Sequence, residues 1–258
     1  MAASLAPHQI GMVPWYTYAS TDPAKGRDFY RQLFGWTIEQ SPDPAMAEHP
    51  MFAAEGVPFA DVAAMPPAVP SHWATYGVVE DVDATLQRVV ERGGRILQSP
   101  LDLAGVGRMG CFQDPWGAAL WAYTPSESTQ LEWAMGNREG QICWHELLAA
   151  DARQAEAFYR DIFGWKIQSR PEMNLWMIHV GEKPIGHIMD LPSAAEGRPS
   201  AWFLYVLTGD LETTCGKAMA LGATLLMPKT EVPNTGWFCF LQDPAGAHFY
   251  LWQPAGPC

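Results

Sequence analysis

The sequence predicts an α+β fold made of four β-α-β-β-β units. Two observations carry this prediction. The stretch FYRQLFGW at 29–36 returns as FYRDIFGW at 158–165, with six of eight positions identical, and each half of the chain shows the same order of strand and helix patterns twice. One such unit of about 55 residues has one apolar sheet face to hide, and pairing two units buries that face. We therefore expect curved mixed sheets inside and helices outside.

The internal repeat has a period of 129 residues, half the chain length. A shift by that amount places Trp15 on Trp144, Asp22 on Asp151, and QDPWG at 113–117 on QDPAG at 242–246. Only the middle slips, by about three residues, so that VPFADVAAMP at 57–66 matches KPIGHIMDLP at 183–192. The expected organisation is a first domain at 1–125, a polar linker at 126–140 and a second domain at 141–258.

The elements of the second half follow from local signals. A strand at 141–149 precedes Asp151, an N-cap type of residue, and a helix whose apolar side chains recur at helical spacing from Ala155 to Phe163. Gly164 is placed to end that helix in left-handed conformation. A second helix is predicted at 210–221 and stops at Gly222. Further strands are predicted at 165–169, 174–180, 184–191, 201–207, 223–227, 236–242 and 247–252. The four copies span 10–66, 71–124, 141–192 and 199–254.

Composition excludes several classes of function. The formal net charge is -12 and the sequence pI is near 4.9, which would repel nucleic-acid phosphates and anionic membranes. The N-terminus has no basic region followed by an apolar run, so we expect a cytoplasmic protein. Five cysteines without CxxC spacing predict free thiols, buried except for an exposed Cys258. The sequence also lacks a GxSxG elbow, a P-loop and a dinucleotide-binding glycine pattern.

These motifs together resemble the vicinal oxygen chelate superfamily, which includes glyoxalases, bleomycin-resistance proteins and extradiol dioxygenases. The resemblance rests on an opening strand, D-x(6)-FYR-x-x-FGW, a mid-domain aromatic strand and QDPxG before a last strand. It covers nearly the whole chain, and tandem two-domain glyoxalase-like proteins are the nearest fit. The resemblance implies cupped sheets that, in the family's enzymes, hold a divalent metal through His or Glu. Fold membership alone names no reaction.

The positions that the resemblance assigns to metal ligands hold aromatic residues in this chain. They are Trp15 and Trp144 on the opening strands, Trp73 and Trp202 on the mid-domain strands, and Trp121 and Tyr250 on the closing strands. An indole offers no acceptor lone pair and a neutral phenol is a poor ligand. Asp61 and His187 match each other near the remaining position, and a single such residue cannot hold a metal. No conventional metal site is therefore predicted.

A displaced metal site in the second half is an alternative. Glu146 lies two residues after Trp144, and His248 two residues before Tyr250, so each shares a strand face with its aromatic neighbour. With His187 they would give a His-His-carboxylate set suited to a divalent transition metal. The first half has Thr17 and Ala119 at the matching positions, so the alternative applies to the second half alone.

The aromatic positions allow two interpretations. Their side chains fill the cups as ordinary core, or they line two pockets that stack on a flat or apolar ligand. Several other residues are interpreted as structural. Arg31 and Arg160 are read as solvated helix residues, Asp81 and Asp210 as helix caps, Asp114 and Asp243 as turn residues, Cys111 and Cys239 as inert thiols, and His72 and His145 as pointing away from the cup.

Three hypotheses about function follow. The first is a metal-independent binder of a small aromatic or apolar molecule, with Trp15, Trp73, Trp121, Trp144, Glu146, Trp202, His248 and Tyr250 as ligand-binding residues. The second is a lyase, isomerase or dioxygenase that uses a divalent metal on Glu146, His187 and His248. The third is that one half has lost its pocket and completes the fold or a homodimer interface. The sequence does not decide whether a reaction is catalysed.

Overall fold

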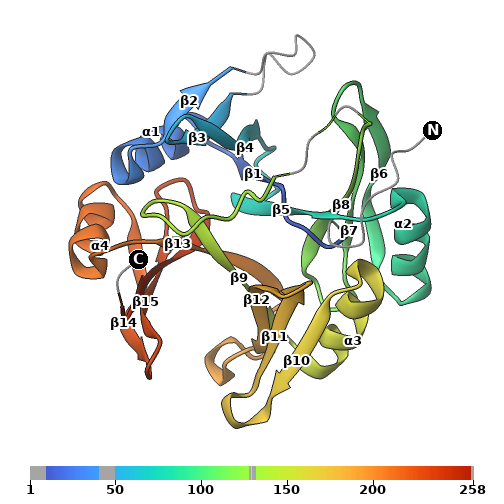
Figure 1. Cartoon of the computed structure of the whole chain (residues 1–258). Coiled ribbons are helices and arrows are strands. Elements are labelled where there is room, and N and C mark those ends of the chain that lie inside the picture. Colours follow the sequence, from blue (N-terminus) through green and yellow to red (C-terminus); the bar gives the residue numbers. More distant parts are fainter. Residues whose placement is uncertain (1–9, 41–49, 128, 130–131, 257–258) are drawn as a thin grey trace. The chain divides into compact units, whose positions relative to one another are not determined.

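The computed structural model describes residues 10–40, 50–127, 129 and 132–256. These residues form two eight-stranded mixed sheets and four α-helices (Figure 1). The first sheet has the strand order β2-β3-β4-β1-β5-β8-β7-β6, and the second repeats it as β10-β11-β12-β9-β13-β16-β15-β14. The predicted α+β fold of four β-α-β-β-β units is confirmed. Cys258, which the sequence predicts to be an exposed thiol, lies outside the described residues.

Each half of the chain supplies two β-α-β-β-β units, which we call modules 1 to 4 in chain order. Module 1 contains β1 (Trp15–Ser20), α1 (Pro23–Phe34), β2 (Thr37–Glu39), β3 (Met51–Ala54) and β4 (Val57–Ala64). Module 2 contains β5 (His72–Val78), α2 (Val82–Glu91), β6 (Arg95–Leu103), β7 (Gly107–Gln113) and β8 (Ala119–Pro125).

The second half repeats this order with two short 3-10 turns added. Module 3 contains β9 (Ile142–Ala149), α3 (Ala152–Phe163), β10 (Lys166–Arg170), η2 (Pro171–Met173), β11 (Leu175–Val180) and β12 (Lys183–Asp190), and η3 (Ser193–Ala195) follows. Module 4 contains β13 (Ala201–Leu207), α4 (Leu211–Ala220), β14 (Thr224–Val232), β15 (Gly236–Gln242) and β16 (His248–Pro254). In every module the first and last strands pair in parallel and the other pairs are antiparallel.

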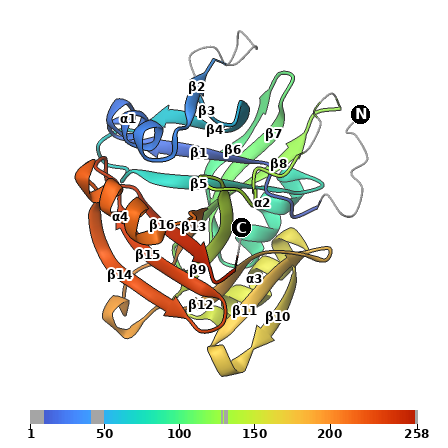
Figure 2. The same ribbon diagram turned by 60° about the vertical axis from the view of Figure 1, so that its left-hand side comes forward.

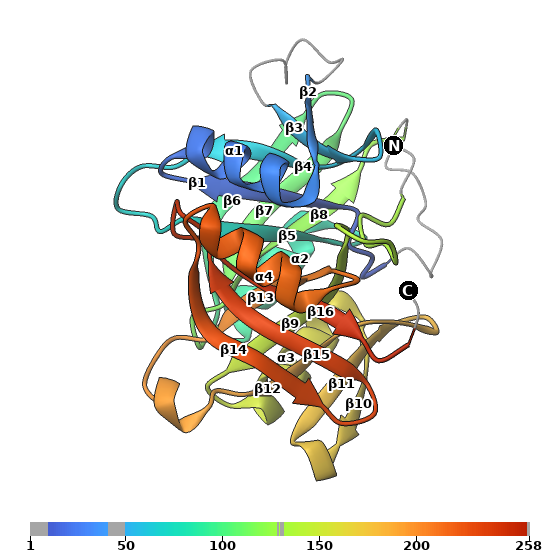
Figure 3. The ribbon, with the colours of Figure 1, turned by 90° about the vertical axis from the view of Figure 1, so that its left-hand side faces the viewer.

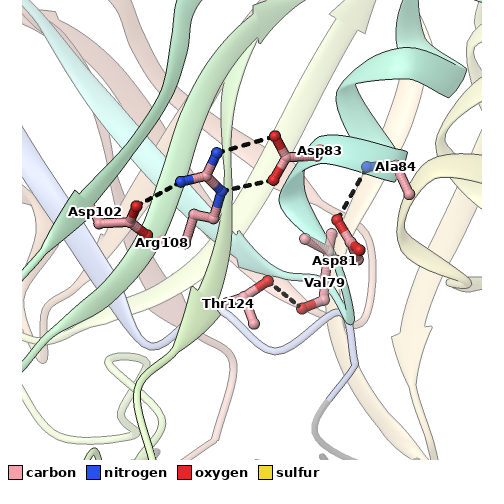
Figure 4. Close-up of polar contacts among 7 residues, drawn as sticks. All are labelled: Val79, Asp81, Asp83, Ala84, Asp102, Arg108 and Thr124. Atoms are coloured by element: carbon pink, nitrogen blue, oxygen red, sulfur yellow. Dashed lines mark hydrogen bonds and ion pairs between the residues drawn. The ribbon is translucent and has the colours of Figure 1, made fainter. Parts of the chain in front are cut away.

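The helix boundaries follow the predicted signals. Asp151 caps α3 by accepting a hydrogen bond from the Gln154 amide, and Asp81 and Asp210 cap α2 and α4 in the same way. Gly164 ends α3 with φ of 65°, the left-handed conformation that glycine adopts without steric cost. Figure 4 shows the Asp81 cap beside a surface ion pair in which Arg108 contacts both Asp83 and Asp102.

The chain divides into two compact units that cut across its two halves. Most of modules 2 and 3 belongs to the first unit, which contains Thr75–Trp133 and His145–Trp202 and in which α2 contacts α3. Module 1 and most of module 4 belong to the second, which contains Trp15–Ala74 and Phe203–Cys258 and in which α1 contacts α4. Figures 2 and 3 show α4 lying over the strands of module 4 and α1 over those of module 1. The sheets therefore follow the sequence repeat, whereas each compact unit joins one module from each half.

The repeated FYR-x-x-FGW motif forms the aromatic core beneath the helices. In module 3, Tyr159 and Phe163 of α3 stack on Trp165, which follows Gly164 at the helix end. The Trp165 indole donates a hydrogen bond of 2.9 Å to the Gly11 carbonyl within the same unit. Tyr30 and Trp36 stack in the same manner in module 1. The motif is thus a packing motif of each opening helix, and its rings bury large apolar areas.

Candidate ligand-binding site

Each sheet has a helix-covered face and an opposite face, which we call the open face. On β1, Tyr16 and Tyr18 are buried, and the Tyr18 ring lies against Gly26 of α1. Trp15 and Thr17 alternate with these tyrosines and so occupy the open face. On β16, Phe249 packs on Phe29 of α1, which places His248 and Tyr250 on the open face. The sequence-predicted site residues can be sorted by this criterion.

Trp73 and Trp202 do not lie on the open face, which corrects the interpretation that groups them with the other pocket residues. Trp73 packs among Tyr18, Phe52 and Trp36 and donates a hydrogen bond of 2.9 Å to the Tyr30 hydroxyl. Trp202 occupies the equivalent place and donates to the Tyr159 hydroxyl at 3.0 Å. The reason is that successive side chains of a strand point to opposite faces. Trp73 lies three residues before Tyr76, and Trp202 three before Tyr205, so each tryptophan points to the face opposite its tyrosine.

A carboxylate bridges two neighbouring strands on the open face of module 1. Asp61 of β4 lies opposite Thr17 of β1 in the parallel register. Its Oδ1 accepts hydrogen bonds from Thr17 Oγ1 at 2.6 Å and from Trp15 Nε1 at 2.8 Å. Trp15 is half-buried, and its indole N–H is directed at a protein carboxylate. This arrangement fixes the ring and satisfies one oxygen of Asp61 with protein donors.

In module 3 the carboxylate lies on the first strand, β9, rather than on the last strand as in module 1. Glu146 of β9, at the position of Thr17, lies opposite His187 of β12, at the position of Asp61. His187 Nε2 and Glu146 Oε1 are 2.9 Å apart. Glu146 is only 4 % exposed, and among the described residues its Oε2 has no hydrogen-bond partner. Trp144, the counterpart of Trp15, is half-buried on the same strand.

Module 4 presents a row of stacked rings on its open face. Tyr205 of β13 stacks on Tyr250 of β16 with centroids 4.3 Å apart and planes 8° apart. Tyr250 stacks on Phe240 of β15 at 4.3 Å, and Phe240 stacks on His248 at 5.5 Å. Phe203 stands perpendicular to Phe240. We call these residues, together with Phe238, the ring row.

The ring row contains residues that the sequence analysis missed. His248 and Tyr250 are among the predicted site residues, whereas Phe203, Tyr205, Phe238 and Phe240 are not. The signal that identifies them is the i, i+2 spacing of aromatics on β13 and β15, which places each pair on one sheet face. Phe203, Phe238, Phe240 and His248 are half-buried, whereas Tyr205 and Tyr250 are buried. The row therefore offers accessible ring surface.

Module 2 has a much reduced version of this row. Tyr76 of β5 stacks on Trp121 of β8 with centroids 5.2 Å apart. The other positions of the row, shifted by 129 residues, carry Ala74, Met109, Cys111 and Ala119. Burial raises the pKa of the Cys111 thiol to about 12, in agreement with the interpretation of Cys111 as inert. The two halves have thus diverged most in the aromatic content of this open face.

The residues do not suit the family's conventional metal site. Five of the six expected ligand positions hold indoles, which have no lone pair for a metal, and Tyr250 lies within the ring row. The alternative set of Glu146, His187 and His248 is not assembled. Within the described part of the chain, no three His, Cys, Asp or Glu side chains lie close enough together to hold a metal ion. The Glu146 and His187 side chains contact each other.

The QDPxG aspartates do more than form turns. Asp114 is buried, its Oδ1 accepts hydrogen bonds from the Trp116 and Ala118 amides, and its Oδ2 accepts one from Tyr159 at 2.9 Å. Burial raises the pKa of the Asp114 carboxyl. Asp243 accepts from Tyr18 in the same way. The turn prediction is confirmed, but the buried tyrosine bond could not be read from the sequence because its partner lies 45 residues away.

The remaining predicted structural residues behave mainly as expected. Cys143 is a correction, because its thiol is half-buried, while the thiols of Cys111, Cys215 and Cys239 are free and buried. A surface pocket of about 780 Å³ is lined by Trp116, Ala150, Leu191, Ser193, Glu196, Gly197, Arg198 and Pro199. None of these lining residues belongs to the predicted site. In the described residues, no helix has the length and apolar character needed to cross a membrane.

Comparison with known proteins decides the family. The sequence model of the Glyoxalase/Bleomycin resistance protein/Dioxygenase superfamily matches residues 13–122 and 141–251. The chain belongs to this superfamily. Similar superfamily proteins include one named "Putative glyoxylase CFP32" from Mycobacterium tuberculosis, 31 % identical over 96 % of this chain and 97 % of that protein. Another is the anthracycline biosynthesis protein DauV of a Streptomyces species, 29 % identical over 93 % and 92 %.

Solved structures show the same fold at low identity. The Mn(II)-bound glyoxalase from Novosphingobium aromaticivorans matches with a TM-score of 0.64 and 14 % identity, covering 95 % of this chain and 82 % of that one. Homoprotocatechuate 2,3-dioxygenase from Arthrobacter globiformis matches with a TM-score of 0.62 and 15 % identity, covering 97 % and 82 %. The first of these neighbours is Mn(II)-bound, but likeness at this identity concerns the fold alone.

Proposed function

We propose that this superfamily member binds a small, flat aromatic or apolar molecule and does so without the family's conventional metal site. The observation that carries the proposal is the ring row of module 4. Half-buried Phe203, Phe238 and Phe240 leave ring surface uncovered beside two buried tyrosines. A flat ligand that covers this surface removes apolar area from water, which stabilises the complex by about 25 cal/mol for each Å² buried. It can also stack on the rings.

Two relatives support an aromatic ligand. The proteins named for anthracycline biosynthesis in Streptomyces sp. and Streptomyces peucetius are 29 % and 28 % identical to this chain over 93 % of it. Anthracyclines contain fused planar rings, a shape that suits stacked aromatic side chains. A ligand of this class would use the ring row as a stacking surface. The metal-free part of the proposal is supported by the indoles that occupy the ligand positions.

Calorimetry with planar probes tests the binding proposal. We expect flat aromatics such as 2-naphthol and 2-methoxynaphthalene to bind. The Phe240→Leu variant should weaken binding about fivefold, because one stacked ring is worth about 1 kcal/mol. Trp237→Leu is the matched control. Trp237 neighbours the row on β15 but is directed to the opposite face. Absence of binding by these probes, or equal losses in both variants, would contradict the proposal.

A second candidate function is a metal-dependent lyase, isomerase or dioxygenase. One observation favours it: Glu146 and His187, both of ligand type, are in contact on paired strands. Metal analysis of protein purified without chelator separates the two functions. A stoichiometric metal that is lost in a Glu146→Ala, His248→Ala double variant would support the second candidate and overturn the metal-free proposal.

A further inference from the structure

The carboxylate of Glu146 is half-satisfied. Its Oε1 contacts His187 Nε2 at 2.9 Å, while its Oε2 is buried and has no hydrogen-bond partner among the residues that the structure describes. The side chain is 5 % exposed. A buried acceptor without a donor costs about 1–3 kcal/mol, and more when charged, so native structures contain few such atoms. This atom therefore calls for a donor other than those that the described residues supply.

The surroundings of Glu146 are apolar and accessible. Across the strands, His187 lies between Glu146 of β9 and Met177 of β11 in register. Met177, Met189 and Leu148 share this open face and are half-buried. On the opposite face, Leu147, Ile178 and Ile188 are fully buried. A ligand on the open face would therefore meet thioether and aliphatic surface around a single polar pair.

In module 1, donors from the chain itself contact the carboxylate at the equivalent cross-strand position. Asp61 occupies the position equivalent to His187 and Thr17 that equivalent to Glu146. There Thr17 and Trp15 both donate to Asp61 Oδ1. The first half thus supplies two protein donors to one oxygen of a half-buried carboxylate. In the second half, the buried Glu146 Oε2 has no donor among the residues that the structure describes.

We propose that Glu146 Oε2 accepts a hydrogen bond from an O–H or N–H group of the bound molecule, with His187 holding the carboxylate in place. The ligand of this face is then an apolar molecule with one donor, such as a phenol, rather than a plain hydrocarbon or an ether. The inference rests on the proposed small-molecule function and adds the ligand class for the open face of module 3. Glu146 makes the polar contact, and His187 is a positioning residue.

A pair of probes that differ in one donor tests this inference. 2-Naphthol carries a hydroxyl, and 2-methoxynaphthalene carries the same rings without the donor. We expect wild type to bind 2-naphthol about tenfold or more tightly than the ether, since hydrogen bonds to charged acceptors are among the strong ones. Glu146→Gln should abolish this preference by weakening 2-naphthol alone. The matched control, Asp61→Asn, replaces the satisfied carboxylate and should keep the preference.

The outcomes separate the inference from the proposed function. Equal binding of both probes by wild type, or equal loss of both in Glu146→Gln, overturns the inference and leaves the proposed function standing. Binding of neither probe by wild type overturns both. Thermal unfolding of the ligand-free variant shows whether it folds. We expect Glu146→Gln to be at least as stable as wild type, because the amide removes an incompletely paired buried carboxylate. Marked destabilisation would assign Glu146 a structural role and contradict the inference.

Discussion

Tyr159 of α3 donates a hydrogen bond of 2.9 Å to Asp114, which lies 45 residues earlier in the QDPxG turn. The same tyrosine hydroxyl accepts a hydrogen bond from Trp202 at 3.0 Å. All three residues belong to one compact unit, so this chain of hydrogen bonds connects the opening helix of module 3 to the last turn of module 2. The other unit contains the analogous bond from Trp73 to Tyr30.

Tyr159→Phe should destabilise the protein by about 1–3 kcal/mol, because it leaves the buried Asp114 Oδ2 and Trp202 Nε1 without their partner. Urea unfolding of the variant measures this loss. A double-mutant cycle with Asp114→Asn isolates the Tyr159–Asp114 bond from other effects of each change. Strictly additive losses in the double variant would show that the two side chains are not coupled.

His145 predicts a pH dependence of stability. It is fully buried, its Nδ1 lies 2.8 Å from the Ile185 carbonyl oxygen, and burial lowers its pKa to about 4. Between pH 6.5 and 4 the unfolded chain binds a proton at this residue that the folded chain does not. The contribution of neutral His145 to the free energy of unfolding is therefore fully present above about pH 6.5. It is lost as the pH falls toward 4, by about 3 kcal/mol in total.

The His145→Asn variant tests this contribution, because the asparagine amide can still donate near the Ile185 carbonyl but does not titrate. Urea unfolding from pH 7.5 to pH 4 should show a smaller loss of stability in the variant than in wild type. Stability at pH 7.5 gives the pH-independent cost of the change. Parallel curves for the two proteins would show that another group causes the acid dependence.

Two glycines predict opposite effects of an added methyl group. Gly164→Ala should cost about 1 kcal/mol, because Gly164 holds φ at 65°, where a side chain is strained. Gly216→Ala should stabilise by about 0.5–1 kcal/mol, since Gly216 lies inside α4 and a Cβ there would meet no atom within 4 Å. Thermal unfolding of both variants checks the signs. A loss at Gly216 or a gain at Gly164 would contradict the conformational argument.

The sequence predicts the fold well because the repeat states each element twice. Asp151, Gly164 and the helical spacing up to Phe163 suffice to place α3 and its ends. The faces of the mid-domain strands are predicted less well. Family spacing predicts Trp73 and Trp202 to lie with the open-face residues. Each lies three residues before Tyr76 or Tyr205, however, which turns it toward the helices. A count of strand parity corrects this.

Other parts of the candidate site depend on contacts that no local pattern encodes. The Asp114–Tyr159 bond joins residues of different modules. Whether Glu146 Oε2 has a partner depends on all the donor groups around it in the folded protein. Those groups can come from strands that are distant in the sequence. The contact between Glu146 and His187 follows from parallel pairing of β9 with β12, whose register no spacing in the sequence specifies. The ring row, by contrast, is visible as aromatic pairs at i and i+2.

The exchange of the carboxylate between paired strands has a consequence for protein engineering. Thr17–Asp61 and Glu146–His187 occupy matching cross-strand positions with the acid on opposite strands. Grafting Glu and His onto positions 17 and 61 would transplant the polar pair of one repeat into the other, and a chimaera made that way would carry two copies of it in a single polypeptide.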